Sequence, residues 1–104
     1  GANIFLVIDG VIHTPIPDCF LDGITRRSVM GLARDRGFKI EERVIMPDDL
    51  SRADEIFVTG TAAEVTPVGQ IGDLRFTVGP VTTALMDDYE KLVHTPELVE
   101  SPAA

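Results

Sequence analysis

Short blocks of apolar residues separated by turn residues run along the chain, and their spacing predicts a mixed α/β domain. Apolar runs of about four to eight residues between Gly, Pro and Asp are typical of strands, whereas apolar residues three and four positions apart are typical of helices. The runs predict strands at residues 4–8, 11–14, 38–45, 55–59 and 74–77, with an extended segment at 65–71. The helical spacing predicts helices at residues 25–36 and from 79 onward, and Pro47 followed by two acids predicts a short helix opening at 47–50.

Turn and boundary residues support these assignments. Asp9-Gly10 is typical of a two-residue hairpin turn, so residues 4–8 and 11–14 are predicted to pair. Pro15 and Pro17 lack the N–H group that a strand donates, and they end the hairpin. The apolar residues of the last helix form one stripe: Val81, Leu85, Tyr89 and Leu92. The order of elements implies one or two layers, with a sheet that is parallel, antiparallel or both.

Length, charge and cysteine content narrow the possible roles. The chain has 104 residues, enough for one domain. We expect residues 1–93 to form it and residues 94–104 to be a flexible tail. The net charge of −8 argues against a nucleic acid partner, because phosphate backbones bind Lys and Arg. No apolar stretch reaches the roughly 20 residues of a membrane span. The single cysteine, Cys19, excludes an internal disulfide and favours the cytoplasm.

A first candidate site opens the helix predicted at residues 25–36, in the run Leu21-Asp22-Gly23-Ile24-Thr25-Arg26-Arg27. A helix N-terminus presents N–H groups without helical partners, and its dipole favours an anion. Thr25 adds a hydroxyl, and a bound phosphate would explain two arginines in a turn where cations oppose the dipole. The alternative is structural, with Thr25 as an N-cap and Arg26 and Arg27 pointing into water.

A second candidate site follows the strand predicted at residues 55–59, in the run Thr59-Gly60-Thr61-Ala62-Ala63. Small residues let a backbone approach a ligand closely, and threonine hydroxyls bind phosphate oxygens. Ligands in α/β proteins commonly bind beyond the ends of strands. The alternative is an ordinary turn built from small side chains. If this run and the first one converge in space, they would form a phosphate-binding cup.

The other polar residues give weaker indications of chemistry. Metal binding is not expected at His13 or at His94, which lie on a hairpin strand and near the end of the chain. Both lysines are expected to be exposed: Lys39 and Lys91. Two acidic pairs are expected to be solvated helix faces: Asp48-Asp49 and Asp87-Asp88. Glu64 and Cys19 have no predicted catalytic partner.

Together, the runs resemble the C-terminal part of the fold-type IV (class IV) aminotransferases that depend on pyridoxal 5'-phosphate (PLP), and among them the branched-chain amino acid aminotransferases. Four anchors in family-like order carry the resemblance: Asn3-Ile4-Phe5 with Asp9-Gly10, then Gly23-Ile24-Thr25-Arg26, then Ala53-Asp54-Glu55-Ile56-Phe57 leading into the run from Thr59 to Val68, and finally Gly79-Pro80-Val81-Thr82. The resemblance implies the fold of that domain, a mixed α+β sheet or pseudo-barrel with flanking helices.

The resemblance implies that both candidate sites bind the phosphate of PLP. After Gly23 opens the helix, Ile24 and Thr25 would offer backbone N–H groups to the phosphate. The hydroxyl of Thr25 would bind it as well. Gly60 and Thr61 would form the opposite wall, with the Thr61 hydroxyl on the same phosphate.

The resemblance also assigns contacts to the cofactor ring and to the substrate. Leu21 would pack on the ring, and the N–H groups of Thr61 and Ala62 would bind the substrate α-carboxylate. The implied reaction is amino-group transfer between branched-chain L-amino acids and 2-oxoglutarate, with PLP as the electron sink.

Several groups that the family needs precede the Asn3-Ile4-Phe5 run: the lysine that carries the cofactor, the glutamate that pairs with its pyridine nitrogen, and a phosphate-binding arginine. A strand-like start without methionine fits a chain that begins inside such a protein. We therefore expect no transamination by the 104-residue chain alone. Its partners would be the N-terminal part of the enzyme and, by family analogy, a second subunit.

Two alternatives stay open at the level of sequence. D-amino acid aminotransferases and aminodeoxychorismate lyases share the fold and the phosphate site, although the Gly60–Glu64 run resembles theirs less. A non-catalytic binding module is the alternative from another class, and a reading frame without an upstream lysine would favour it.

Overall fold

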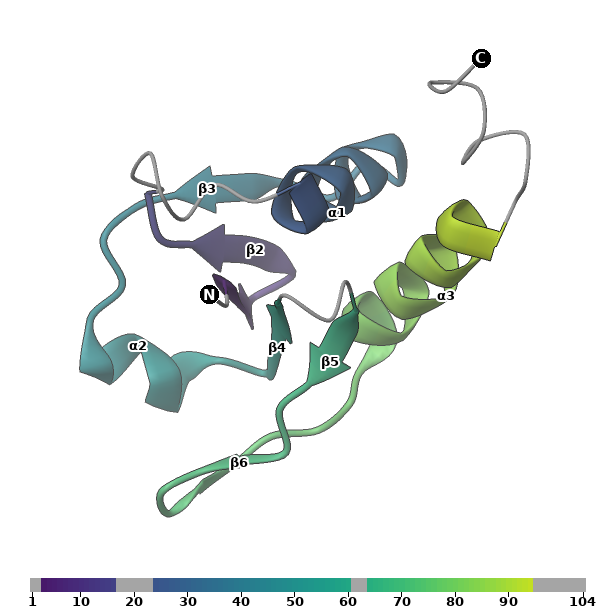
Figure 1. Ribbon diagram of the computed structural model, residues 1–104. Helices are drawn as coiled ribbons and strands as arrows, with labels where there is room; N and C mark the ends of the chain where they lie inside the picture. The colour runs from purple at the N-terminus through teal and green to yellow at the C-terminus, as the bar shows by residue number, and fades with distance from the viewer. Residues whose placement is uncertain (1–2, 17–23, 61–63, 95–104) are drawn as a thin grey trace.

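The computed structural model describes residues 3–16, 24–60 and 64–94 of the chain. Its elements in chain order are β1 (Asn3–Ile8), β2 (Val11–Thr14), α1 (Ile24–Asp35), β3 (Ile40–Glu42), α2 (Pro47–Arg52), β4 (Glu55–Thr59), β5 (Val65–Pro67), β6 (Gln70–Ile71), β7 (Leu74–Arg75) and α3 (Pro80–His94). The main sheet has the strand order β3-β2-β1-β4-β5, and the hairpin that contains β6 extends away from it (Figure 1). The expected mixed α+β fold is confirmed.

β1 is the central strand, and it runs antiparallel to both of its neighbours. It pairs with β2 through Val7 and Ile12 and with β4 through Phe5 and Phe57. β3 lies parallel to β2, whereas β5 lies antiparallel to β4. The sheet is therefore mixed, with one parallel pair that needs a crossover connection, and α1 lies in that connection.

The turn between β1 and β2 has the geometry that its sequence predicts. Asp9 and Gly10 both have positive φ, at 51° and 78°. Positive φ at both central residues defines the type I′ turn, whose twist matches that of a hairpin. Asp54 secures the turn from the other side of β1, because its backbone N–H donates to the Val7 carbonyl at 2.7 Å and its carboxylate accepts from the Asp9 N–H at 3.3 Å.

One face of the sheet packs against α1 and α3 and forms the larger core. The rings of Phe5 and Phe57, from neighbouring strands, are stacked with their centroids 4.9 Å apart. The helices cover this face with buried side chains: Val29, Met30 and Ala33 from α1, and Val81, Leu85 and Tyr89 from α3. The predicted apolar stripe of the last helix is confirmed as the face that α3 presents to the sheet.

The opposite face of the sheet has a smaller core. Leu6, Ile8 and Ile56 are buried there because successive side chains of a strand point to opposite faces. Partly buried residues from α2 and from the segment around β6 and β7 cover them: Leu50, Ala53, Val68, Ile71 and Phe76. α2 and this segment therefore cover the second face of the sheet.

Three predicted extended segments are shorter in the structure than the sequence pattern implies, and one of them, the strand expected at residues 74–77, is reduced to β7 (Leu74–Arg75). The strand expected at residues 38–45 is reduced to β3, because after the Arg43 N–H donates to the Thr14 carbonyl the chain turns toward α2 and leaves Val44 exposed. The segment expected at 65–71 divides into β5 and β6. α3 runs to His94, where the tail was expected to begin, and residues 95–104 lie outside the described part of the chain.

A buried carboxylate fixes the start of α3. Glu55, at the beginning of β4, is only 5% exposed. Its Oε1 accepts from the Thr82 N–H at 2.8 Å, and its Oε2 from the Val81 N–H at 3.4 Å. These N–H groups lie in the first turn of a helix and have no helical acceptor, so a negative charge there is favourable. Gly79 makes the approach possible, because a Cβ at that position would lie 2.5 Å from Glu55 Cδ.

We expect Gly79→Ala to destabilise the protein by about 1–3 kcal/mol, because the added methyl group displaces the Glu55 carboxylate from the helix N-terminus. Gly31→Ala is the matched control. Gly31 lies inside α1, where an added Cβ would meet nothing within 4 Å. In a helix interior this change is expected to stabilise by about 0.5–1 kcal/mol. The free energy of unfolding in urea measures both, and equal effects of the two substitutions would contradict the steric account.

Candidate functional site

The sheet topology brings the ends of β2 and β4 to one edge of the sheet. β1 is antiparallel to both strands, so both run toward the edge at which β1 begins. Asn3 pairs with Thr59, the last residue of β4. On the other side, the hydroxyl of Thr14, the last residue of β2, donates to the Ile4 carbonyl at 2.7 Å. The chain segments that follow β2 and β4 therefore start close together.

α1 begins at this same edge. It lies in the crossover between β2 and β3, which are parallel, so α1 must return the chain from the end of β2 to the start of β3. The first residues of α1 and Gly60, which directly follows β4, consequently lie at the same edge of the sheet. Carboxyl ends of strands beside a helix N-terminus are where α/β folds commonly bind ligands.

The residues at this edge have distinct surroundings. Ile24, the first residue of α1, is 84% exposed. Thr25 is half-buried, and its Oγ1 lies 3.5 Å from the hydroxyl of Tyr89. Thr59 is 1% exposed, and its Oγ1 has no hydrogen-bond partner within the described ranges. A buried hydroxyl without a partner is unfavourable, and Thr82 Oγ1, in the first turn of α3, is in the same state within the described ranges.

Of the predicted site residues, three lie in the described part of the chain: Ile24, Thr25 and Gly60. The other four lie outside it: Leu21, Gly23, Thr61 and Ala62. The described residues bracket both loops, since α1 starts directly after Gly23 and Gly60 directly precedes Thr61. The roles assigned to all seven residues stay predictions.

The two arginines in the first turn of α1 differ from each other. Arg26 does not point into water: it is 3% exposed, and its Nη2 donates to the Pro15 carbonyl at 3.2 Å and to Glu42 Oε2 at 3.0 Å. Its charge is matched by Glu42, and it ties α1 to the end of β3. Arg27 is exposed. Arg26 therefore has a structural reason to occupy the first turn of α1 without a bound phosphate.

The helices also differ in what their N-termini hold. The start of α3 is occupied by Glu55, and the start of α2 by Asp49, whose carboxylate accepts from the Met46 N–H at 2.7 Å. The first turn of α1 contains no acidic residue. The first turn of α3 contains none either, and Glu55 comes to it from β4.

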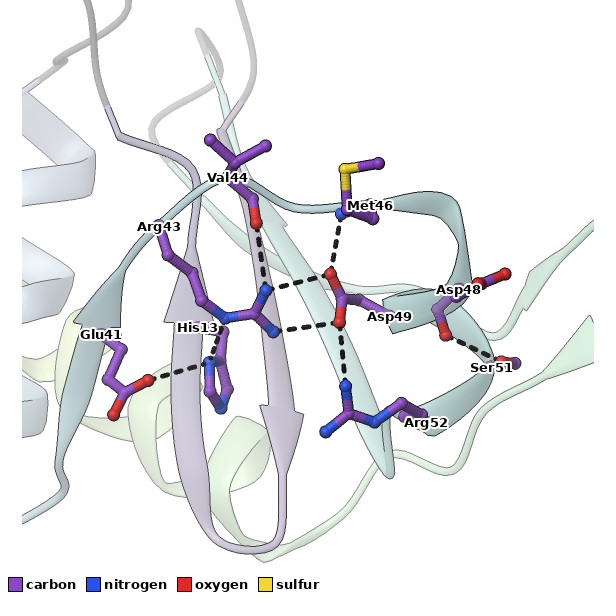
Figure 2. A network of polar contacts seen from close by, with 9 residues as sticks. All are labelled: His13, Glu41, Arg43, Val44, Met46, Asp48, Asp49, Ser51 and Arg52. Carbon is purple, nitrogen blue, oxygen red and sulfur yellow. Dashed lines mark hydrogen bonds and ion pairs between the residues drawn. The ribbon is translucent and has the colours of Figure 1, made fainter.

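A separate polar network joins the second face of the sheet to α2 (Figure 2). At its centre, Asp49 accepts two hydrogen bonds from Arg43, at 3.0 and 3.1 Å, and one from Arg52 at 3.2 Å. The expectation that Asp49 belongs to a solvated helix face is wrong, because the residue is buried among these partners. Asp48, beside it, is exposed as expected.

The second acidic pair, Asp87-Asp88, also has one exposed member and one member in an ion pair. Asp87 is exposed as expected, whereas Asp88 pairs with Arg36, whose Nη2 lies 2.8 Å from Asp88 Oδ1. The side-chain hydrogen bond from Arg36 lowers the pKa of Asp88. This ion pair joins the end of α1 to α3, so Asp88 contributes to helix packing.

His13 belongs to the network of Asp49 and has a structural role there. Its Nδ1 accepts from Arg43 Nε at 3.0 Å. Burial, and then the charge of Arg43, lower the pKa of His13 below 6.5, so the ring is neutral at physiological pH. No cluster of three or more possible metal-ligating side chains occurs in residues 3–16, 24–60 and 64–94. The network therefore holds α2 against β2 and β3.

Two residues with specific polar contacts in the fold, Tyr89 and Glu55, were not identified as such in the sequence. Tyr89 was assigned to the apolar stripe of the last helix, although a tyrosine in such a stripe brings a hydroxyl that needs a partner. Glu55 gave no local signal, because its partners lie 26 and 27 residues further along the chain.

Family comparison agrees with this geometry. The family described as Amino-transferase class IV matches residues 1–71, and the chain belongs to that family. The branched-chain-amino-acid aminotransferase of Pseudomonas aeruginosa is 46% identical over 96 residues, covering 89% of this chain and 31% of that protein. The probable branched-chain-amino-acid aminotransferase of Thermotoga maritima is 43% identical over 96 residues, covering 88% of this chain and 35% of that protein.

Solved structures share the fold. The T.th. branched-chain amino acid aminotransferase complexed with N-(5'-phosphopyridoxyl)-L-glutamate superposes with a TM-score of 0.84 at 43% identity, covering 94% of this chain and 35% of that one. An aminotransferase from Brucella abortus bound to PLP gives a TM-score of 0.84 at 35% identity, covering 90% and 34%. The chain thus spans about a third of the length of these relatives. No helix in the described ranges is long and apolar enough to cross a membrane.

We expect the stability of the protein to fall as the pH drops from about 5 toward 2, because Asp49 must be charged to hold α2. The hydrogen bonds from Arg43 and then from the Met46 N–H lower its pKa from 3.8 to about 2 in the folded protein. A carboxylate whose pKa is lowered by folding stabilises the protein above its unfolded pKa, and this stabilisation is lost as the pH falls through the folded value.

Asp49→Asn is therefore expected to lower the urea midpoint at pH 7 and to flatten its decline below pH 5. Asp48→Asn, which changes the exposed neighbour, should leave both nearly unchanged. An acid dependence that is identical in the wild type and in Asp49→Asn would contradict this role.

Proposed function

We propose that this chain is the cofactor-binding C-terminal part of a PLP-dependent branched-chain amino acid aminotransferase. The proposal is supported by the sheet topology, which places the start of α1 and the end of β4, with the buried Thr59, at the same edge of the sheet. The branched-chain names of relatives at 46% and 43% identity support the substrate class. The solved relatives that hold PLP or a phosphopyridoxyl compound support the cofactor.

The described residues at this edge fit a phosphate group. A phosphate carries strong acceptor oxygens and negative charge, so it requires N–H or hydroxyl donors and a field that favours an anion. The first turn of α1 offers such a field without an acidic residue of its own. Ile24 and Thr25 would donate their backbone N–H groups, and Thr25 would add its hydroxyl. Gly23 would let the backbone approach closely.

The loop after β4 would complete the cup. Gly60 would allow the chain to turn beside the phosphate, and Thr61 would donate its hydroxyl to the same group. The backbone N–H groups of Thr61 and Ala62 would hold the α-carboxylate of the amino acid. Leu21, from the loop before α1, would pack on the cofactor ring. This chain would thus bind and orient the cofactor and the substrate, and exclude water from one side of them.

When bound, PLP supplies the electron sink for amino-group transfer. The residue that carries the cofactor and moves protons is assigned to the part of the protein that precedes this chain. Both lysines present here are exposed, and Lys39 lies before β3, at the edge of the sheet opposite the candidate site. Lys91 lies on the outer side of α3.

The proposal includes partners and a compartment. The remaining two thirds of the enzyme would cover apolar side chains that are exposed near the site edge and on the approach to α2: Ile16, Ile24, Val44 and Met46. A second copy of the enzyme would complete a homo-oligomer, as the family resemblance implies. We place the enzyme in the cytoplasm, which the single cysteine of this chain favours.

Activity assays on the full-length protein test this function. With 2-oxoglutarate as acceptor, we expect amino-group transfer from L-leucine, L-isoleucine and L-valine, and little from D-alanine. The isolated 104-residue chain is expected to transfer none, because it has no lysine at the candidate site. Preferred turnover of D-alanine, or cleavage of aminodeoxychorismate, would contradict the substrate assignment. Transamination by the isolated chain would contradict the division of roles.

A further inference from the structure

Tyr89 of α3 meets Thr25 of α1 across 64 residues of sequence. The two hydroxyl oxygens lie 3.5 Å apart, and either can donate. Tyr89 is 8% exposed and belongs to the larger core, where its ring packs with side chains of both helices. The contact therefore connects the C-terminal helix to the first turn of α1, where the phosphate is proposed to bind.

Contacts on α3 limit the freedom of the Tyr89 hydroxyl. Glu55 holds the first turn of α3 against the start of β4. Asp88, the residue before Tyr89, is held by Arg36 at the end of α1. With α3 fixed at its start and beside Tyr89, and with the ring enclosed in the core, the phenol hydroxyl is held near Thr25.

The chemistry of hydroxyl groups determines which of the two hydroxyls donates in this hydrogen bond when a phosphate is bound. A threonine hydroxyl has one hydrogen to donate and two lone pairs that accept. If Thr25 gives its hydrogen to a phosphate oxygen, the hydrogen bond with Tyr89 must run from the phenol to Thr25 Oγ1. A hydroxyl that accepts one bond while donating another is fixed in rotation, and such chains strengthen each member.

We propose that Tyr89 is a positioning residue for the cofactor phosphate: it donates to Thr25 Oγ1 and so directs the Thr25 hydrogen toward the phosphate. This inference rests on the proposed function, because it needs a phosphate at the start of α1. Tyr89 itself does not touch the cofactor. Its effect should therefore depend on the hydroxyl of Thr25 and on the phosphate of the ligand.

The test measures dissociation constants on the full-length protein for two probes, pyridoxamine 5'-phosphate and pyridoxamine, which lacks the phosphate. Tyr89→Phe keeps the buried ring and removes only the hydroxyl. It is expected to weaken the binding of pyridoxamine 5'-phosphate by about 2- to 10-fold, the range for one hydrogen bond. The binding of pyridoxamine should be unchanged. The ³¹P chemical shift of bound pyridoxamine 5'-phosphate should also move in this variant.

Two further variants test whether Tyr89→Phe weakens binding through the hydroxyl of Thr25. In a Thr25→Val background, Tyr89→Phe should cause no additional loss, because the hydroxyl on which it acts is absent. Thr25→Ser keeps a hydroxyl and should restore the sensitivity to Tyr89→Phe. Asp87→Asn is the matched control: it changes an exposed side chain of the same helix, two residues from Tyr89, and the preference for the phosphorylated probe should persist.

The outcomes separate this inference from the proposed function. If the wild type binds both probes equally, the proposed function fails and the role of Tyr89 fails with it. If the wild type prefers the phosphorylated probe, but Tyr89→Phe weakens both probes alike or weakens binding equally in the Thr25→Val background, the positioning role is overturned and the proposed function stands. An unchanged constant and an unchanged ³¹P shift in Tyr89→Phe would also overturn the positioning role.

Discussion

The antiparallel pairing of β1 with both of its neighbours is the constraint on which the rest of the structure depends. Because β2 and β4 both oppose β1, they run in the same direction although they are far apart in sequence, and Asn3 lies beside Thr59. Because β3 is parallel to β2, α1 has to start where β2 ends. The start of α1 and the end of β4, which are distant in sequence, are thereby brought to one edge of the sheet.

Electrostatics then distinguishes the three helix N-termini. At two of them, buried carboxylates of the chain itself accept hydrogen bonds from backbone N–H groups: Glu55 at α3 and Asp49 at α2. Both are needed for packing, since one fixes the C-terminal helix and the other fixes the layer on the second face of the sheet. α1 has no acidic residue in its first turn, and it starts at the edge where the loop after β4 also begins. An anion bound at this edge would complete the pattern that the other two helices already follow.

Local signals in the sequence predicted the elements that depend on neighbouring residues. Asp9-Gly10 predicted the type I′ hairpin, and the stripe through Tyr89 predicted the buried face of α3. The sequence could not show whether the two candidate runs converge, because the pairing direction of β2 and β3 depends on the tertiary fold. Asp48 and Asp49 look alike in sequence; the Pro at the first helical position with an acid two residues later was the one sign that Asp49 is a cap. Glu55, Arg26 and the contact of Tyr89 with Thr25 depend on partners far along the chain.

We propose that the start of α1 and the loop after β4 together form one phosphate-binding cup. A crystal structure of the full-length protein with bound PLP tests it most directly. We expect the phosphate oxygens to lie within hydrogen-bond distance, about 2.7–3.2 Å, of the Thr25 N–H and Oγ1 and of the Thr61 hydroxyl. A phosphate held at another edge of the sheet, or one bound only by residues outside these two segments, would contradict it.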